Sequence, residues 1–428
     1  MIKSLSILFF IIHSSLFSFG QKKNLYNPSE RGILKKSFYA LSDSILLNED
    51  IDNQLDTLYK LSINKQIVAI GEVTHATEEV LQFQTLIARN LVEKHHFKCI
   101  VLGEIGLIDS YKFNDFVING RGNINSIGYR QVRFIKLLKW VQGFNSDKPF
   151  HEKIWIIGTD IEAPAVMLCF IEEYCKQFHL TSAMPIIEEI NKLLEKGIKS
   201  NEGSINTIQA LSLQLTSILN ESRNQIDSSN LKIDIMIRGI AIMPKILPFL
   251  TNFNLGYKVR DKFIFENIDW LIQSCKKDKI VIIKSHNFHV NKKTIYTELF
   301  GKFPTFGEYL NNTYKDKYLS IGTEIQKGTF YNGTLPYSEV IEHPHKLGNI
   351  IGEHLSSKYS ILFSDGLLRP LLNKKNLKIS YGTLNYPGYV TDCKGVLGDA
   401  FDALIFIKNS TPYQFIYYKN SKVIKVNE

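Results

Sequence analysis

Short apolar runs that recur along the chain constrain its fold more than any other feature of the sequence. Stretches with helical periodicity separate these runs, which are 67–70 (IVAI), 97–103 (FKCIVLG), 153–158 (KIWIIG), 279–284 (KIVIIK), 318–322 (YLSIG) and 401–408 (FDALIFIK). Runs that are apolar at successive positions are typical of strands buried on both faces, and helical connections favour parallel pairing. The sequence therefore predicts an α/β fold with a mostly parallel sheet flanked by helices.

The longest interval between strands lies between the third and fourth runs. Apolar residues there recur at three- and four-residue steps over about 165–255, which predicts a large helical insertion between the third and fourth core strands. Two interpretations stay open for this insertion, a lid and a separate domain. We otherwise expect 21–428 to form a single domain, with a helical lead-in over 21–60 and a last strand over 401–408, for which we consider a position at a sheet edge.

The N-terminal segment 1–20 has the pattern of a secretory signal peptide. Lys3 precedes an apolar run over 5–19, and Ser18 and Gly20 supply the small residues typical of a cleavage site. A membrane anchor is the alternative, but the run is short and polar residues interrupt it. We therefore predict an exported protein, periplasmic or extracellular, whose mature chain has no stable membrane span.

Composition excludes several other classes. Apolar residues make up 44% of the 428-residue chain and charged residues 22%, as in soluble globular proteins. The formal net charge is +9, but the basic residues are dispersed, so a nucleic-acid partner is not predicted. Five cysteines without a C-x-x-C spacing form neither a disulfide scaffold nor a recognisable zinc site.

Polar side chains follow four of the apolar runs directly. These residues are Glu72 and His75 after the first run, Glu104 after the second, Asp160 and Glu162 after the third, and His286, Asn287 and His289 after the fourth. Because the carboxyl ends of parallel strands share one edge of a sheet, where ligands bind, we expect the four loops to converge on one site.

The residue types indicate hydrolysis. A histidine beside a carboxylate can take a proton from water, and a second histidine can donate to the oxyanion that forms on a carbonyl. The G-x-S-x-G nucleophile motif is absent from the sequence, which favours ester or amide hydrolysis without a covalent serine intermediate. The alternative is a divalent metal, since histidines and carboxylates are common ligands of zinc and manganese, and the spacing does not separate the two readings.

The motifs resemble those of the erythromycin esterase family, in the same order, from about residue 55 to about 410. GEVTHATEEV (71–80) resembles the family's G-E-x-x-H-x-x-x-E-F stretch, and SHNFHV (285–290) resembles its H-N-x-H-V motif. VLGEIG (101–106) and IIGTDIEA (156–163) resemble its acidic segments, and YKVRDKFIFENIDWL (257–271) resembles its R-D-x-x-M-x-x-N helix.

The resemblance implies an α/β hydrolase that takes an ester or lactone as its small-molecule substrate and needs no cofactor. Members that give the family its name open macrolide lactone rings with water, so antibiotic resistance is one implied role. Carried over by position, the catalytic residues are His75, Glu72, Glu104, His286 and His289, with His75 as general base. The implied substrate-binding residues are Arg260, Asp160 and Asn287. The metal-dependent alternative uses His75, Glu104, His286 and His289 as ligands.

Four positions depart from the family pattern near the expected pocket. Gln84 replaces a residue that is often basic, Ala76 and Phe288 stand where glycine is common, and Ile264 replaces a methionine. These changes put a macrolide substrate in doubt and leave a third hypothesis open, a family member that binds a small ligand without turning it over.

Overall fold

The computed structural model describes the chain in eleven segments. They are 25–46, 53–124, 131–196, 202–223, 231–249, 253–273, 278–295, 301–331, 338–383, 386–419 and 422–426. The predicted signal peptide over 1–20 lies outside them. No helix in these segments has both the length and the apolar character needed to cross a membrane.

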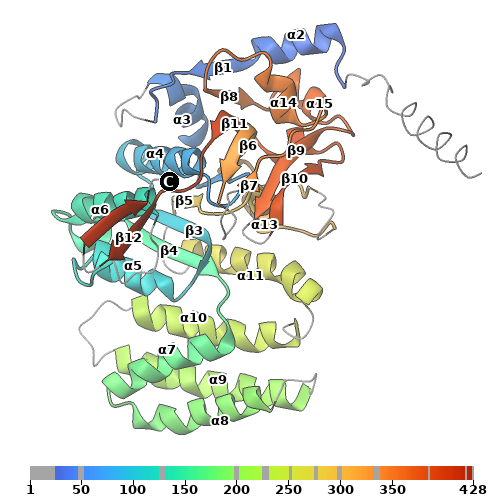
Figure 1. Ribbon diagram of the computed structural model, residues 1–428. Coiled ribbons are helices and arrows are strands. Elements are labelled where there is room, and N and C mark those ends of the chain that lie inside the picture. The colour runs from blue at the N-terminus through green and yellow to red at the C-terminus, as the bar shows by residue number, and fades with distance from the viewer. Residues whose placement is uncertain are drawn as a thin grey trace, which may run out of the picture.

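A mostly parallel sheet forms the centre of the molecule, which confirms the predicted fold class (Figure 1). The strands stand in the order β1-β8-β11-β6-β2-β5-β3-β4, and β7 pairs with β6. The five neighbouring pairs from β11 to β4 are parallel, and β1 and β8 join antiparallel. The bounds are β1 (Phe38–Leu41), β2 (Ile67–Ile70), β3 (Cys99–Gly106), β4 (Trp155–Asp160), β5 (Ile280–Ile283), β6 (Tyr318–Phe330), β7 (Ser338–Glu339), β8 (Tyr359–Phe363) and β11 (Ala403–Ser410).

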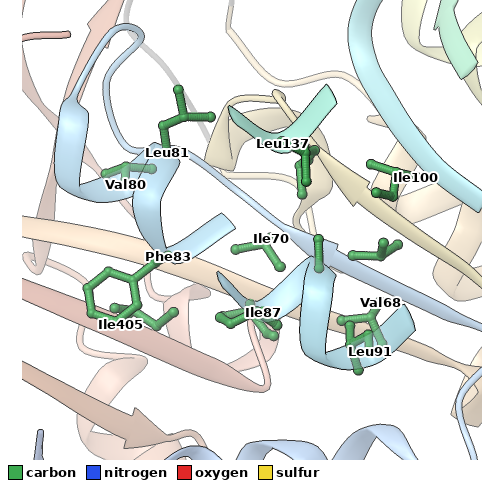
Figure 2. Packing of buried hydrophobic residues seen from close by; sticks show 14 of the residues in the cluster. Val68, Ile70, Val80, Leu81, Phe83, Ile87, Leu91, Ile100, Leu137 and Ile405 are labelled. Atoms are coloured by element: carbon green, nitrogen blue, oxygen red, sulfur yellow. The ribbon is translucent and has the colours of Figure 1, made fainter. Parts of the chain in front are cut away.

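Alternate side chains of the central strands enter two different hydrophobic cores, one on each face of the sheet. On one face Val68, Ile70 and Ile100 pack against Phe83 and Ile87 of α4 (Glu78–His95), as Figure 2 shows. The same core includes residues of α5 (Asp109–Val117) and α6 (Val132–Asn145). Complete burial on both faces explains why these strands read as continuous apolar runs.

The opposite face is covered largely by α11 (Phe253–Gln273) and α13 (Phe306–Tyr314). Ile264, Ile268 and Leu271 of α11 pack there with Ile67 and Ala69 of β2. Shorter helices complete the layers: α2 (Pro28–Lys36), α3 (Asp56–Ser62), α12 (Asn287–Val290), α14 (Leu347–Gly352), α15 (Leu368–Leu372) and α16 (Leu397–Ala400).

Between β4 and β5 the described residues form helices joined by short turns and loops, with no strand. The helices α7 (Pro164–Gln177), α8 (Met184–Glu195), α9 (Glu202–Ser222) and α10 (Leu231–Ile246) pack around a third hydrophobic core and lie beyond α11, away from the sheet (Figure 1). The position of these helices is consistent with a lid and with a separate domain, so both interpretations stay predictions.

The N- and C-terminal parts differ from the sequence expectation. The lead-in expected to be helical contains an edge strand, β1, which pairs with β8. The run 401–408, for which we considered an edge position, forms β11 between β6 and β8. Two hairpins follow from local pairing, β9 (Lys378–Thr383) with β10 (Tyr386–Asp392) and β12 (Phe415–Lys419) with β13 (Lys422–Val426).

Candidate active site

The loops that follow β2 and β5 are bonded to each other at the carboxyl edge of the sheet. Glu72 N donates to Ser285 O at 2.8 Å, and Asn287 N donates to Glu72 O at 2.8 Å. Gly71 permits this approach, because a Cβ there would stand 2.5 Å from Asn287 Oδ1 and 2.9 Å from Asn287 Cα. The glycine that follows β2 is therefore a packing requirement of the site.

An open pocket of about 320 Å³ lies at this edge. The strand-end loops and α11 contribute one part of its wall, and more distant segments contribute the rest. The lining residues are Glu72, His75, Ala76, Glu104, Ile105, Gln131, Arg260, Lys284, Tyr331, Tyr413 and Phe415.

His75 is the imidazole of the pocket wall, and it forms a dyad with Glu72. His75 Nδ1 contacts Glu72 Oε1, while His75 Nε2 makes no hydrogen bond to the described part of the chain. Burial by itself lowers the pKa of His75, but attraction to the Glu72 carboxylate and the hydrogen bond outweigh it, so the pKa lies above the ordinary 6.5. The dyad fixes the ring and leaves one nitrogen for a ligand or water.

Glu104 and Asp160 bind Arg260 from two adjacent strands. Arg260 Nε and Nη2 donate to Asp160 Oδ1 and Oδ2 at 2.9 and 2.5 Å, and both terminal nitrogens lie 3.4 Å from Glu104 Oε1. Burial raises the pKa of Glu104, but the positive charges of His289, His75 and Arg260 hold that pKa well below its usual range. The guanidinium is thus already paired with two carboxylates.

His289 is enclosed between two carboxylates. Its Nδ1 lies 2.9 Å from Asp261 Oδ1, its Nε2 lies 3.3 Å from Glu104 Oε1, and only 3% of the residue is exposed. Burial lowers the pKa of His289, but Asp261 and Glu104 raise it above its ordinary value overall. The two carboxylates therefore favour the protonated form of this ring, which lies inside the protein rather than on the pocket wall.

His286 and Asn287 also point into the protein. Phe288 N donates to His286 Nδ1 at 3.1 Å, so Nε2 carries the proton and donates to Val73 O at 2.8 Å. Burial and the neighbouring His75 lower the pKa of His286 to about 3. The Asn287 amide bonds the backbone of Thr323 on β6 at 2.7 and 3.1 Å. Both residues fasten the loop after β5 to its neighbours.

All eight predicted site residues therefore lie around this edge of the sheet, but only four line the pocket: Glu72, His75, Glu104 and Arg260. Glu162, which also follows a strand, accepts from Ile108 N at 2.9 Å and packs against Gly106. Among the described residues, no three histidine, cysteine or acidic side chains are arranged to hold one metal ion.

Three residues of the cluster were not predicted from sequence. Asp261 is part of the R-D pair that carries the resemblance, so its position was marked but its contact with His289 was not. Lys284 is the last residue of an apolar run, where a lysine is usually interpreted as a solvent-exposed residue at the end of a strand. The Tyr413 hydroxyl donates to Glu72 Oε2 at 3.4 Å, although the two residues are 341 positions apart in the sequence. No motif near Tyr413 indicates that it belongs to the site.

A short C-terminal stretch, 411–415, closes one side of the pocket. It pairs with the loop before α4 at Thr77 and with the start of α6 at Gln131. Glu79 in the first turn of α4 accepts from both the backbone N and the hydroxyl of Thr411, each at 2.8 Å. These contacts bring Tyr413 and Phe415 against the β2 loop.

A second pocket of about 340 Å³ lies between α2 and the segment before α14. Its histidines include His343 and His345, which bond each other through His345 N and His343 Nδ1 at 3.0 Å. Burial lowers the pKa of His343. The described residues of that pocket form no imidazole–carboxylate dyad, so we assign the chemistry to the pocket at the sheet edge.

Two comparisons with known sequences point to one family. The erythromycin esterase family model matches residues 247–410. Erythromycin esterase type II from Escherichia coli is 23% identical over 321 residues, which cover 66% of this chain and 74% of that protein. The chain is thus similar to the erythromycin esterase family in both comparisons. This similarity supports a hydrolase that acts on esters.

Solved structures share the erythromycin esterase-like fold. A Bacillus cereus protein is 23% identical with a TM-score of 0.72, covering 91% of this chain and 99% of that one. A mutant of the erythromycin esterase EreC in its open conformation is 18% identical with a TM-score of 0.65, covering 90% and 99%. At these identities the likeness bears on the fold alone.

Proposed function

We propose that this protein is an esterase that hydrolyses a carboxylic ester or lactone with a water molecule activated by His75. The observation that carries the proposal is the Glu72–His75 dyad, which presents Nε2 of His75 to an open pocket of about 320 Å³. A general base with a pKa near neutrality can remove a proton from water while it attacks a carbonyl carbon.

In this proposal the reaction needs no covalent enzyme intermediate. Water gives a proton to His75 Nε2 as its oxygen bonds to the carbonyl carbon, and the carbonyl electron pair moves to oxygen. When the oxyanion collapses, the bond to the alcohol oxygen breaks, and the His75 imidazolium returns its proton to that oxygen. Glu72 stabilises the imidazolium between the two steps through its contact with Nδ1.

The enclosed charges have a supporting role in this scheme. Glu104 lies between Arg260 and His289, and its Oε2 accepts from His286 N at 2.6 Å. Asp160, the last residue of β4, pairs with Arg260, which in turn contacts Glu104. We propose that this network fixes the strand-end loops, and that Glu104 adds negative charge that favours protonation of His75.

The metal-dependent alternative would need His75, Glu104, His286 and His289 to bind one ion. Each nitrogen of His286 and His289 already has a partner in the protein, so an ion would have to replace those hydrogen bonds. This favours the metal-free scheme in our proposal. A divalent metal would act on the same water by lowering its pKa.

The deciding experiment is a hydrolysis panel of nitrophenyl esters, simple lactones and erythromycin, run with and without EDTA on protein of measured metal content. We expect turnover that resists chelation. Stoichiometric metal with activity lost to EDTA would overturn the metal-free scheme. A rise in melting temperature with a ligand but no turnover of any ester would indicate a binding protein instead.

Export remains part of the proposal because the charge and apolar pattern of 1–20 supports it. N-terminal sequencing of protein recovered from the periplasm or the medium tests it. A first residue near Gln21 is expected, and intact protein retained in the cytoplasm would contradict export.

A further inference from the structure

Lys284 stands at the point where β5 ends and the loop to His286 begins, in an uncommon backbone conformation. Its φ is +53°, in the left-handed region that residues with a Cβ rarely adopt. Lys284 N donates to Gln84 Oε1 at 3.4 Å, and Lys284 O accepts from Glu104 N at 3.2 Å. The surrounding chain therefore holds Lys284 in a strained conformation, which is a common property of functional positions.

The ammonium group of Lys284 is in the pocket wall and is only lightly bonded. Lys284 Nζ donates to the Tyr413 hydroxyl at 3.3 Å and lies 5.0 Å from the centre of the same ring. It forms no ion pair with a carboxylate in the described part of the chain. An ammonium has three donors, so two N–H bonds are left for a ligand.

The other cation of the pocket, Arg260, has a different environment. Its guanidinium is paired with Asp160 and Glu104, which offset its charge. Lys284 interacts with Glu72 and Glu104 only over a longer distance, and burial lowers the pKa of Lys284. Lys284 is thus the pocket cation whose charge is available to an incoming anion.

Tyr413 links this ammonium to the dyad. The hydroxyl accepts from Lys284 Nζ and lies 3.4 Å from Glu72 Oε2, and Glu72 Oε1 contacts His75. The base and the ammonium are therefore connected through one tyrosine and one carboxylate. In an ester hydrolase those two functions must act on the same carbonyl group.

We propose that Lys284 is a catalytic residue whose ammonium binds the carbonyl oxygen of the substrate and stabilises the oxyanion formed when water attacks. This rests on the proposed esterase function. The proton of water goes to His75, the carbonyl electron pair goes to oxygen, and Lys284 keeps its own protons and donates one hydrogen bond. When the bond to the alcohol breaks, the charge leaves that oxygen and the hydrogen bond weakens.

The first test compares Lys284→Met, Lys284→Arg and a matched control, Lys279→Met. Lys279 directly precedes β5, whereas Lys284 directly follows it, and Lys279 Nζ donates to Ile63 O and His95 O. We expect Lys284→Met to lower kcat by about 10²- to 10³-fold, as for loss of one oxyanion donor, with KM little changed. Lys284→Arg should recover part of the loss, and Lys279→Met should behave as the wild type.

A second measurement is independent of turnover. Phenylphosphonate carries negative oxygens in the tetrahedral arrangement of the intermediate, and its binding is measured by calorimetry on the wild type and on Lys284→Met. We expect the wild type to bind it at least about tenfold more tightly than Lys284→Met. Equal affinity, or no binding by the wild type, would overturn the role of Lys284.

The two measurements separate the inference from the function on which it rests. A wild type that hydrolyses esters, with Lys284→Met equally active, overturns the role of Lys284 and leaves the esterase proposal intact. A wild type that hydrolyses no ester in the panel overturns the esterase proposal, and phosphonate binding then decides whether Lys284 is an anion-binding cation. Circular dichroism and the melting temperature of each variant show whether it folds, and Lys284→Arg replaces Lys284→Met if the latter does not.

Discussion

The polar cluster at the sheet edge has two sides that use the same residue types differently. We call His75, Lys284 and Tyr413 the pocket side, and Asp160, Asp261, His286 and His289 the enclosed side. On the enclosed side each imidazole nitrogen has a partner within the protein. On the pocket side His75 Nε2 makes no hydrogen bond to the described part of the chain, and Lys284 Nζ donates only to Tyr413. Residue type alone therefore does not distinguish supporting residues from reactive ones. The distinction is whether the polar atoms of a side chain already have hydrogen-bond partners within the protein.

The largest expected effect comes from removing the base of the pocket side. His75→Gln should reduce kcat by about 10²- to 10⁴-fold while the melting temperature stays near that of the wild type, because only one side chain on the pocket wall changes. His151→Gln is the matched control, since His151 has a side chain that is 79% exposed. Full activity in His75→Gln would remove the dyad from the mechanism.

Arg260 lines the pocket but is paired with Asp160 of the enclosed side, so its removal should act mainly on stability. Arg260→Met leaves the carboxylates of Glu104 and Asp160 without their cation, which should lower the free energy of unfolding by about 3 kcal/mol. Urea unfolding of Arg260→Met and of Arg369→Met measures the difference, since Arg369 forms only a distant pair with Asp399 at 3.5 Å and is largely exposed. A stable but inactive Arg260→Met would instead show that Arg260 acts in the reaction together with the pocket side.

The pH dependence tests the coupling within the dyad. His75 must be neutral to accept a proton, and Glu72 raises its pKa above 6.5, so kcat/KM of the wild type should rise with pH through a value above 6.5. Glu72→Gln removes that charge, so this limb should move to lower pH, with a loss of kcat on the order of 10²-fold. A limb that does not move would show that another group titrates.

The smallest effect concerns the backbone of the β2 loop. Ala76 has a φ of +64°, and its carbonyl accepts from Tyr413 N at 3.1 Å. Ala76→Gly should raise the free energy of unfolding by about 0.5 to 1 kcal/mol, because glycine adopts this conformation without strain. Ala163→Gly, at a φ of −61°, should not stabilise the protein. Thermal unfolding compares the two, and equal shifts would contradict the strain argument.

The sequence predicted the meeting of the strand ends because parallel topology requires it. Glu72, Glu104, Asp160 and the residues after β5 follow buried strands, and the edge of the sheet is set by chain direction alone. The role of each side chain was not predictable in the same way. Whether an imidazole is enclosed, as in His289, depends on a contact with Asp261 of α11, which belongs to a different layer.

Other parts of the site had no local signal. Lys284 reads as a charge at the end of a strand, and its place in the pocket depends on a left-handed backbone that no residue pattern marks. The edge strand β1 was missed because the helical spacing of Leu55, Leu58 and Leu61 was extended to the whole lead-in, and four residues are too few to show alternation. Both misses concern features that tertiary contacts determine.

The pairing of Tyr413 with Glu72 has a consequence for when the protein becomes competent during synthesis. The two residues are 341 positions apart, so a ribosome makes the whole β2 loop long before the tyrosine that completes the pocket. A chain still being translated carries the dyad but lacks the segment that closes over it. A chain that ends before residue 411 contains every strand of the central sheet but lacks Tyr413 and Phe415, which line one side of the pocket.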